Sequence, residues 1–385
     1  SQVLGILMTN AITFLEISLI GRGRLSVVPM LWLTLGELIG AAVWCILFTK
    51  IFASIYPPRK MLIIYGNSSA SALVKKMSTR VDKYIINDSV SCDDDIDIIK
   101  EKILAHDAVI ICDIPSIMKN QLVKFTFANN IRTYINPKLS DIIIRSADEC
   151  NLFDTPLLLC RNEGTPFEQQ IIKRAADILF SLIALVIASP FMLITAAAIK
   201  IYDGGPVLYS QERLTLNGKK FKVHKFRSMI VNAEKHGAQL AGKNDDRITP
   251  IGKLIRKIRF DELPQLINIL KGDMSFVGPR PERPELAAEY EKDMPEFHYR
   301  LKVKAGLTGY AQVMGKYNTT PYDKLKLDLM YIERQSLALD IKLILMTIKI
   351  CFVPDATEGV DGEMVTTKRE EHSGHTSEEL EKLNR

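Results

Sequence analysis

The sequence lacks closely spaced cysteines and histidines. Its six cysteines are scattered, no two of them form a Cys-x-x-Cys pair, and none has a histidine at metal-ligand spacing. A structural zinc site needs such clusters, so we expect none, and we interpret the cysteines as reduced structural thiols in a cytosolic setting. The six are Cys45, Cys92, Cys112, Cys150, Cys160 and Cys351.

The sequence also lacks a signal-peptide layout and a strong charge of either sign. It opens at Ser1 and passes directly into apolar residues, from which we expect a fragment or a chain without its upstream helices. The net charge of +5 is small for 385 residues. Basic residues therefore matter only where they cluster, and we expect no nucleic-acid partner. The length predicts two or three structural units.

Two apolar runs open the chain, at residues 3–20 and 26–56. Each is long enough to cross about 30 Å of hydrocarbon, which predicts two transmembrane helices within residues 1–57. A pair of buried core helices is the alternative. Glu16 and Glu37 interrupt the runs, and in a membrane they would have to face other helices, the helix ends or a functional cavity.

Strand and helix signals then alternate over residues 61–162. This alternation predicts a small parallel α/β domain of a degenerate Rossmann-like type. A dinucleotide site requires the pattern G-x-G-x-x-G after the first strand, and only its first glycine, Gly66, is present. We therefore favour a scaffold or regulatory module over a cofactor site. The strand candidates are residues 61–65, 84–86, 108–112, 133–135 and 157–159.

A third apolar run covers residues 175–201 and is long enough to span a membrane. Ser189 and Pro190 lie at its middle, where a proline removes a backbone hydrogen bond and bends a helix. Charged residues at both ends suit a kinked span and a hairpin-like re-entry to the same membrane face. Composition alone does not choose between them.

Basic residues cluster after this run. Lys225 and Arg227 alternate onto one face of a predicted strand, and Lys253, Arg256 and Lys257 line one side of a predicted helix. Such a basic stripe beside a membrane segment suits lipid headgroups or a phosphate substrate. A merely solvated helix face is the alternative.

Two adjacent acids, Asp261 and Glu262, follow the basic stripe and stand just before Pro264. Proline is well suited to the first position of a helix. Both carboxylates are therefore expected just ahead of a helix N-terminus, where the helix dipole favours their ionised form. Carboxylates placed there are available as a nucleophile or a metal ligand, and an ordinary helix cap is the alternative.

Near the end of the chain, apolar residues recur at helical spacing between Leu337 and Phe352. This pattern fits an amphipathic helix at a membrane interface, with a soluble core helix as the alternative. Residues 355–385 are polar and acidic, which predicts a disordered tail.

Four motifs, in this order, resemble those of one known family. They are Lys-Phe-Arg-Ser-Met at 225–229, Asp-Glu-Leu-Pro-Gln-Leu at 261–266, a segment ending in Pro-Arg-Pro at 272–281, and Gly-Leu-Thr-Gly at 306–309. Residues 168–354 thereby resemble the bacterial sugar transferase superfamily, the monotopic polyprenyl-phosphate glycosyl-1-phosphate transferases. The upstream regions resemble those of the larger members, which initiate exopolysaccharide or capsule synthesis. Those members usually have four N-terminal helices, so this chain looks shortened by about two.

The resemblance implies a fold class of membrane helices plus α/β structure. N-terminal transmembrane helices and a degenerate Rossmann-like domain would precede a mixed α/β catalytic domain. Its helix at 175–201 would re-enter one leaflet, broken at Ser189-Pro190. The catalytic domain is then expected on the cytoplasmic face of the bacterial inner membrane. Expected partners are the membrane, downstream glycosyltransferases and, through the α/β domain, a second copy in a homodimer.

The resemblance also implies the chemistry. Asp261 would attack the sugar-linked phosphorus of a UDP-sugar, releasing UMP, and undecaprenyl phosphate would then attack the phosphosugar–aspartyl intermediate in a ping-pong reaction. Glu262 would hold the cofactor, Mg²⁺. The residues expected to contact substrate are Lys225, Arg227, Arg256, Arg280, Pro281, Asp328 and Tyr331.

Two positions depart from the family pattern. The loop that often reads Pro-Gly-Leu-Thr-Gly-Trp has Ala305 and Tyr310 at its ends here. Because tyrosine keeps an aromatic face, we expect altered substrate contacts rather than lost activity. Glucose or galactose is the default expectation for the sugar. A non-catalytic membrane scaffold or regulator of polysaccharide assembly is the alternative function.

Overall fold

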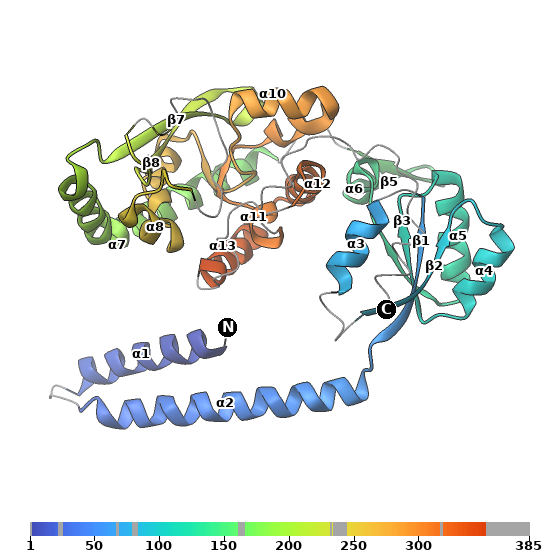
Figure 1. Cartoon of the computed structure of the whole chain (residues 1–385), viewed down its shortest axis with the longest axis horizontal. Coiled ribbons are helices and arrows are strands. Elements are labelled where there is room, and N and C mark those ends of the chain that lie inside the picture. The colour runs from blue at the N-terminus through green and yellow to red at the C-terminus, as the bar shows by residue number, and fades with distance from the viewer. Residues whose placement is uncertain are drawn as a thin grey trace. The chain divides into compact units, whose positions relative to one another are not determined.

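The computed structural model describes residues 2–21, 26–66, 69–78, 84–160, 166–231, 233, 245–315 and 319–351. The predicted tail at 355–385 lies outside the described residues. The chain divides into two compact units, the first ending at Asn136 and the second beginning at Pro137 (Figure 1).

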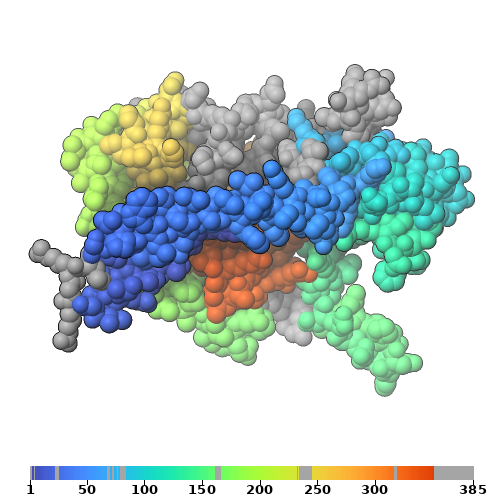
Figure 2. All heavy atoms as spheres, turned by 90° about the horizontal axis from the view of Figure 1, so that it is seen from below, coloured from blue at the N-terminus to red at the C-terminus, as the bar shows by residue number. Residues whose placement is uncertain are grey.

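Two apolar helices open the first unit, as predicted. The helix α2 (Val28–Ile55) is long and apolar enough to cross a membrane. The apolar part of α1 (Gln2–Ile20) is Gly5–Ile20, which is shorter, so a membrane crossing by α1 stays a prediction. No described side chain of α2 is buried, which disfavours a soluble core helix, and Figure 2 shows α2 uncovered along its length on the face in view. The Asn10 amide of α1 donates hydrogen bonds to Glu37 Oε2 (2.6 Å) and Thr34 Oγ1 (3.0 Å) of α2. Glu37 therefore faces the neighbouring helix.

A four-stranded parallel sheet follows, with strand order β2-β1-β3-β4. Met61 and Ile63 of β1 pack with residues of α3, whereas Leu62 and Ile64 pack with residues of α4 and α5. Burial on both faces explains why β1 is continuously apolar rather than alternating. The strands are β1 (Arg59–Tyr65), β2 (Tyr84–Ser91), β3 (Ala108–Cys112) and β4 (Arg132–Ile135), and the helices are α3 (Ser69–Met77), α4 (Ile96–Leu104) and α5 (Ser116–Ala128).

Gly66, the glycine that suggested a nucleotide site, has a structural explanation. A Cβ atom at this position would lie 2.4 Å from the carbonyl oxygen of Asp113, which follows β3. Only glycine allows two backbones to approach so closely. The glycine therefore needs no bound cofactor to account for it.

The second unit opens with α6 (Leu139–Arg145) and an antiparallel pair, β5 (Asp148–Leu152) and β6 (Thr155–Leu159). Residues 157–159, which the sequence suggested as a strand of the α/β domain, thus pair with their near neighbours through a tight turn. All ten residues of this pair are exposed. They do not join the parallel sheet.

The helix α7 (Phe167–Asp203) is the longest in the described chain, at 37 residues, and it contains Pro190. Asp177 and Ser181 are buried near its beginning, and Thr195 and Ile199 near its end. The apolar side chains between them are largely exposed. The helical assignment continues through Ser189-Pro190, so the predicted break and re-entry remain a prediction.

The rest of the second unit combines small sheets with short helices. These sheets are an antiparallel pair, β7 with β8, and a parallel pair, β9 with β10. Their cores include Phe221, Val223, Leu266 and Ile269. The strands are β7 (Leu208–Leu214), β8 (Lys220–Phe226), β9 (Ser275–Val277) and β10 (Gly306–Thr308). The helices are α8 (Pro250–Lys257), α9 (Gln265–Lys271), α10 (Pro284–Asp293), α11 (Tyr310–Met314), α12 (Pro321–Ile332) and α13 (Leu337–Cys351), with short 3₁₀ helices η2 (Leu216–Gly218), η3 (Phe260–Glu262) and η4 (Pro295–Lys302).

Candidate active site

The acid pair lies in η3, on the short connection between α8 and α9. Arg259 adopts a left-handed conformation (φ 60°) where α8 gives way to η3, a conformation that non-glycine residues seldom take. Pro264 directly precedes α9, as predicted. Glu262 is only 8% exposed, and Asp261 is half-buried. Both carboxylates are therefore held in place by the turn that carries them.

Glu262 is paired with cations from two other parts of the fold and with Arg259 at the start of its own turn. Lys225 Nζ of β8 lies 2.9 Å from Glu262 Oε1, and Arg280 Nη2, from the loop after β9, lies 2.8 Å from the same oxygen. Arg259 Nη1 lies 4.0 Å from Oε2. Burial by itself raises the pKa of Glu262, but Arg280, Lys225 and Arg259 outweigh it and hold the pKa well below its usual value. Glu262 is thus a fixed anion.

Asp261 behaves in the opposite way. Burial and the neighbouring Glu262 raise its pKa from 3.8 to about 6, although Lys225, Arg256 and Arg280 lower it in part. Desolvation and the adjacent anion thus shift the pKa of Asp261 upward, but not far enough to remove the ionised form that the sequence predicts. A carboxyl group with a pKa near 6 is still roughly nine-tenths ionised at pH 7. Asp261 is then mostly ionised at neutral pH although its burial disfavours the charged form.

A cavity beside Glu262 is lined by several basic side chains. Lys225 and Arg280 lie on its wall, together with Arg213 of β7, and Arg256 and Arg259 act on the acid pair from the η3 side. Four of these cations, Lys225, Arg256, Arg259 and Arg280, act on the two carboxylates, so the acid pair lies in an excess of positive charge. The cavity is lined by Arg213, Val223, Lys225, Glu262, Gln265, Arg280, Pro281 and Gly306.

The residues present fit a magnesium ion that arrives with a phosphate ligand. No group of three or more His, Cys, Asp or Glu side chains gathers around one point within the described residues. Mg²⁺ typically uses one or two protein carboxylates, substrate phosphate oxygens and water. Asp261 and Glu262 supply such carboxylates. Because Glu262 Oε1 already accepts from Lys225 and Arg280, Glu262 Oε2 is the better-placed oxygen for a metal.

Arg256 and Arg227, two other arginines predicted to contact substrate, differ in their relation to the acid pair. Arg256, in the last turn of α8, influences the site through its charge, which lowers the pKa of Asp261. Arg227 is buried and pairs with Asp203 at the end of α7. A Cβ atom on Gly205 would collide with the Arg227 guanidinium. The structure therefore does not bring Arg227 to the Glu262 cluster.

Asp328 does not line the cavity beside Glu262. Its Oδ2 accepts hydrogen bonds from Nε and Nη2 of Arg300 (3.1 and 2.8 Å), and burial raises its pKa to about 6. Asp328 is 1% exposed. The residue therefore acts on the site only through Arg300.

Tyr331 is also buried away from the cavity. Its hydroxyl donates to Val277 O (2.9 Å) and lies 2.8 Å from Asp340 Oδ1, and Lys173 Nζ of α7 lies 3.2 Å from the same hydroxyl. Tyr331 thus joins α7, β9, α12 and α13. Tyr331 does not line the cavity beside Glu262, and the substrate contact that the resemblance suggested for it stays a prediction.

Arg213 and Gln265 line the cavity but were not predicted from the sequence. In the β7–β8 register, Arg213 is opposite Phe221 and Leu214 is opposite Lys220. Residues opposite each other share a face of the sheet, and so do alternate residues of one strand. Arg213 therefore lies on the face that carries Phe221, Val223 and Lys225. The turn at Asn217-Gly218 could have revealed this register from the sequence. Gln265 is 3% exposed, and only the fold shows that it faces a cavity.

Comparison with known proteins identifies similar chains. Residues 168–354 match the model of the bacterial sugar transferase family. The chain is 45% identical over 181 residues to a UDP-N-acetylgalactosamine-undecaprenyl-phosphate N-acetylgalactosaminephosphotransferase of Aeromonas hydrophila, covering 46% of this chain and 43% of the relative. It is 32% identical over 318 residues to an undecaprenyl-phosphate glucose phosphotransferase of Komagataeibacter xylinus, covering 76% and 58%. The chain thus spans about half the length of these two curated relatives.

A third relative is shorter and is covered more fully. The chain is 51% identical over 130 residues to a Bacillus subtilis (strain 168) protein named "Putative undecaprenyl-phosphate N-acetylgalactosaminyl 1-phosphate transferase". The match covers 34% of this chain and 73% of that relative. With a match of this extent and the family match over the unit that holds the acid pair, the chain belongs to the bacterial sugar transferase family.

Proposed function

We propose that this protein is a phosphoglycosyl transferase that moves a sugar 1-phosphate from a UDP-sugar to undecaprenyl phosphate and releases UMP. The observation that carries the proposal is the acid pair inside an excess of positive charge. One carboxylate, Glu262, is fixed by cations, and the other, Asp261, is left as a reactive anion. Relatives named for transfer to undecaprenyl phosphate support the same reaction class.

In the first step, a carboxylate oxygen of Asp261 attacks the sugar-linked phosphorus of the UDP-sugar. A bond forms between this oxygen and phosphorus as the bond from phosphorus to the bridging oxygen breaks. UMP leaves with the bridging oxygen and its electron pair, and the sugar phosphate stays on Asp261 as an acyl phosphate. No proton has to leave the nucleophile, because Asp261 is mostly ionised at neutral pH.

The cations make this attack feasible. A diphosphate is anionic and repels a carboxylate, so its charge must be neutralised before Asp261 can approach. Arg280 and Lys225 are already beside Glu262 and on the wall of the same cavity. Mg²⁺ held by Glu262 would add further neutralising charge on the diphosphate when bound. Glu262, in turn, keeps the two cations oriented toward the cavity.

In the second step, a phosphate oxygen of undecaprenyl phosphate attacks the same phosphorus. The bond between phosphorus and Asp261 breaks, which restores the carboxylate and gives a polyprenyl-diphosphate-linked sugar. This acceptor is a membrane lipid, so the site has to lie close to a membrane surface. The re-entrant form of α7 meets that requirement, and the contacts at its two ends support it.

The beginning of α7 is fastened to the catalytic unit. Lys173 Nζ donates to Val277 O of β9 (3.2 Å). Arg174 donates through its two terminal nitrogens to the carbonyl oxygens of Ile269 and Leu270 in α9 (2.6 and 2.7 Å). These contacts hold the beginning of α7 directly behind the helix that follows the acid pair.

The end of α7 packs against the same unit. Ile199 belongs to a buried cluster with Phe226 of β8 and Ile255 of α8. Asp203, the last residue of the helix, pairs with Arg227. The end of α7 is therefore held by β8 and α8, which also supply Lys225 and Arg256.

A straight helix of 37 residues is about 55 Å long, and a helix that crosses a bilayer leaves its two ends on opposite sides. Both ends of α7 contact one globular unit, while Val186 and Ile187 between them are 71% and 65% exposed. A helix that dips into one leaflet and returns satisfies both observations. We place the catalytic unit on the cytoplasmic face of the bacterial inner membrane, where it would perform the first membrane step of exopolysaccharide, capsule or glycan synthesis. Downstream glycosyltransferases and a homodimer through the α/β domain are part of the same proposal.

The donor sugar is to be identified by testing several UDP-sugars. The relatives are named for N-acetylgalactosamine and for glucose. The chemistry at phosphorus is the same for each sugar, because Asp261, Glu262 and the cations act on the diphosphate. We therefore include N-acetylgalactosamine beside glucose and galactose in the set of donors to be tested.

The test is release of UMP from these three UDP-sugars in the presence of Mg²⁺ and undecaprenyl phosphate. The wild-type protein should release UMP from at least one donor, and Asp261→Asn should reduce the rate by a factor of about 10³ or more. Asp246→Asn is the matched control, because Asp246 is an exposed aspartate in the segment before α8, and it should retain the wild-type rate. Undiminished UMP release by Asp261→Asn contradicts the mechanism. No turnover with any donor would favour the non-catalytic scaffold.

A further inference from the structure

The loop that carries Arg280 is held at four successive carbonyl oxygens. Pro279 and Pro281 have no backbone N–H, so carbonyl oxygens are the main backbone groups by which this loop can be fixed. Gly278 and Gly306 let the loop lie against β10, because a Cβ atom on Gly306 would be 2.1 Å from Gly278 N. The four bonds are Gly306 N to Pro279 O (2.9 Å), Arg300 Nη2 to Arg280 O (3.1 Å), Arg213 Nη1 to Pro281 O (3.2 Å) and Leu214 N to Glu282 O (3.0 Å).

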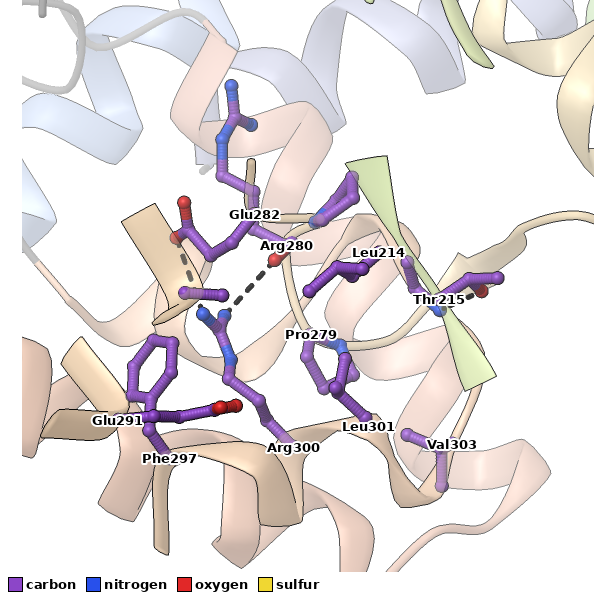
Figure 3. Close-up of a pocket in the computed structure, with 13 residues that line it drawn as sticks. Leu214, Thr215, Pro279, Arg280, Glu282, Glu291, Phe297, Arg300, Leu301 and Val303 are labelled. Atoms are coloured by element: carbon purple, nitrogen blue, oxygen red, sulfur yellow. Dashed lines mark hydrogen bonds and ion pairs between the residues drawn. The ribbon is translucent and has the colours of Figure 1, made fainter. Parts of the chain in front are cut away.

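Arg300 supplies the bond at Arg280 itself. Figure 3 shows its guanidinium below the loop, with dashed lines to Glu282 and to the Arg280 carbonyl. Its Nη1 lies 3.3 Å from Glu282 Oε1, its Nε and Nη2 contact Asp328, and its guanidinium carbon is 4.8 Å from the centre of the Phe297 ring. Arg300 is 4% exposed. A guanidinium held on so many sides has one orientation.

Arg213 supplies the next bond along the loop. Its Nη2 donates to Gln211 Oε1 (2.7 Å) while Nη1 holds Pro281 O. Burial lowers the pKa of Arg213 to about 10, so it remains charged at neutral pH. Because Arg213 also belongs to β7, it ties the loop to the sheet that carries Lys225.

The side chain of Arg280 is not packed in the same way. It is 42% exposed, and it reaches Glu262 Oε1 across 2.8 Å. A long, partly exposed side chain has many rotamers, so packing alone does not fix its direction. The contact with Glu262 and the backbone from which the side chain leaves together limit where its guanidinium can lie.

We propose that Arg300 and Arg213 are positioning residues that fix the backbone of the 279–282 loop and thereby direct Arg280 at Glu262 and at the diphosphate. The inference rests on the proposed function for its catalytic meaning, and on the four carbonyl contacts for its structural meaning. It assigns Asp328 a place as well, because Asp328 holds Arg300. The two arginines act through Arg280, not on the substrate.

The activity test is a double-mutant cycle between positions 300 and 280. Arg300→Lys keeps the charge but cannot reach Asp328, Glu282 and the Arg280 carbonyl at once, so kcat/KM should fall by about tenfold or more. In an Arg280→Met background, the same change should alter kcat/KM by less than about twofold, because no Arg280 guanidinium is left to position. The same cycle is repeated with Arg213→Met in place of Arg300→Lys, because Arg213 is less buried than Arg300. Equal losses in the two backgrounds overturn the proposal.

The pH profile gives a readout that a general loss of stability does not move. Arg280 lowers the pKa of Asp261, so a misdirected Arg280 should move the acid limb of the kcat/KM profile to higher pH in Arg300→Lys. Arg174→Lys is the matched control, since Arg174 also donates to two carbonyl oxygens, but in α9. Its acid limb should stay at the wild-type position. An unmoved limb in Arg300→Lys contradicts the proposal.

A third measurement does not depend on turnover. Amide hydrogen exchange at Leu214, Gly278 and Gly306, whose N–H groups donate to Glu282 O, Thr308 O and Pro279 O, should be at least about tenfold faster in Arg300→Lys than in the wild type, and unchanged in Arg174→Lys. Unchanged exchange in Arg300→Lys overturns the structural part of the proposal. Failure to release UMP from any UDP-sugar would instead count against the proposed function, while the exchange result still decides whether the loop is held in this way.

Discussion

Asp261 should make the protein less stable at neutral pH than a variant without its charge. The raised pKa means that the folded state binds the Asp261 proton more tightly than the unfolded state does. The stabilising contribution of this carboxyl group is therefore full below pH 3.8 and is lost as pH rises through about 6. At pH 7 the mostly ionised Asp261 opposes folding.

The size of the effect follows from the two pKa values. Raising the pKa from 3.8 to about 6 corresponds to roughly 3 kcal/mol. Asp261→Asn keeps the shape of the side chain and removes its charge, so it should recover part of this free energy. For a unit of this size, 1 to 3 kcal/mol corresponds to about 3 to 10 °C in Tm.

Thermal unfolding of detergent-solubilised protein, without nucleotide and with a chelator, measures this effect. The Tm difference between Asp261→Asn and the wild type should be small at pH 4 and should grow up to about pH 7. Asp246→Asn, the exposed control, should show no such growth. A variant at position 261 that is less stable than the wild type at pH 7, or a difference that does not change with pH, would refute the reasoning.

Three other outcomes follow from the site. The acid limb of kcat/KM against pH should have an apparent pKa of about 6, with about a tenfold loss per pH unit below it, because protonated Asp261 cannot attack; a flat profile down to pH 5 in steady-state assays would contradict this. Lys225→Met should reduce kcat/KM by about 10- to 100-fold, because Glu262 and the diphosphate lose a cation; a Lys225→Arg variant that recovers most of the rate would support the role of charge, and an unaffected Lys225→Met would refute it. Tyr331→Phe should reduce the free energy of unfolding by about 1 to 3 kcal/mol and so lower Tm, with little change in kcat, because its hydroxyl joins buried elements. A large loss of kcat at unchanged Tm would support a substrate contact instead.

Local sequence explains why the motifs correctly placed Lys225 and Arg280 beside the acid pair. Lys225 lies on a strand whose partner follows from a short turn, and Arg280 is fixed between two prolines only a few residues from a strand. Such positions depend on short-range backbone geometry, which local sequence specifies well. The early α/β strands were predictable for a similar reason, because strands buried on both faces are continuously apolar.

Other features of the site depend on contacts between distant segments. Whether Arg227 contacts a phosphate depends on where α7 ends, because Asp203 has to be brought to it from a distance. Tyr331 is held by Lys173, which lies 158 positions earlier in the chain. The pKa of Asp261 depends on burial, which no local pattern reports. Contacts between distant segments therefore set the features that the motifs left open.

The central claim is that Asp261 carries the sugar phosphate between the two substrates. The most direct measurement is exchange of isotopically labelled UMP into the UDP-sugar in the absence of undecaprenyl phosphate. The wild-type protein should catalyse this exchange with Mg²⁺ present and Asp261→Asn should not, because the label can return to the donor only through a phosphosugar held on the protein. Full turnover with the lipid acceptor but no exchange without it would contradict the account.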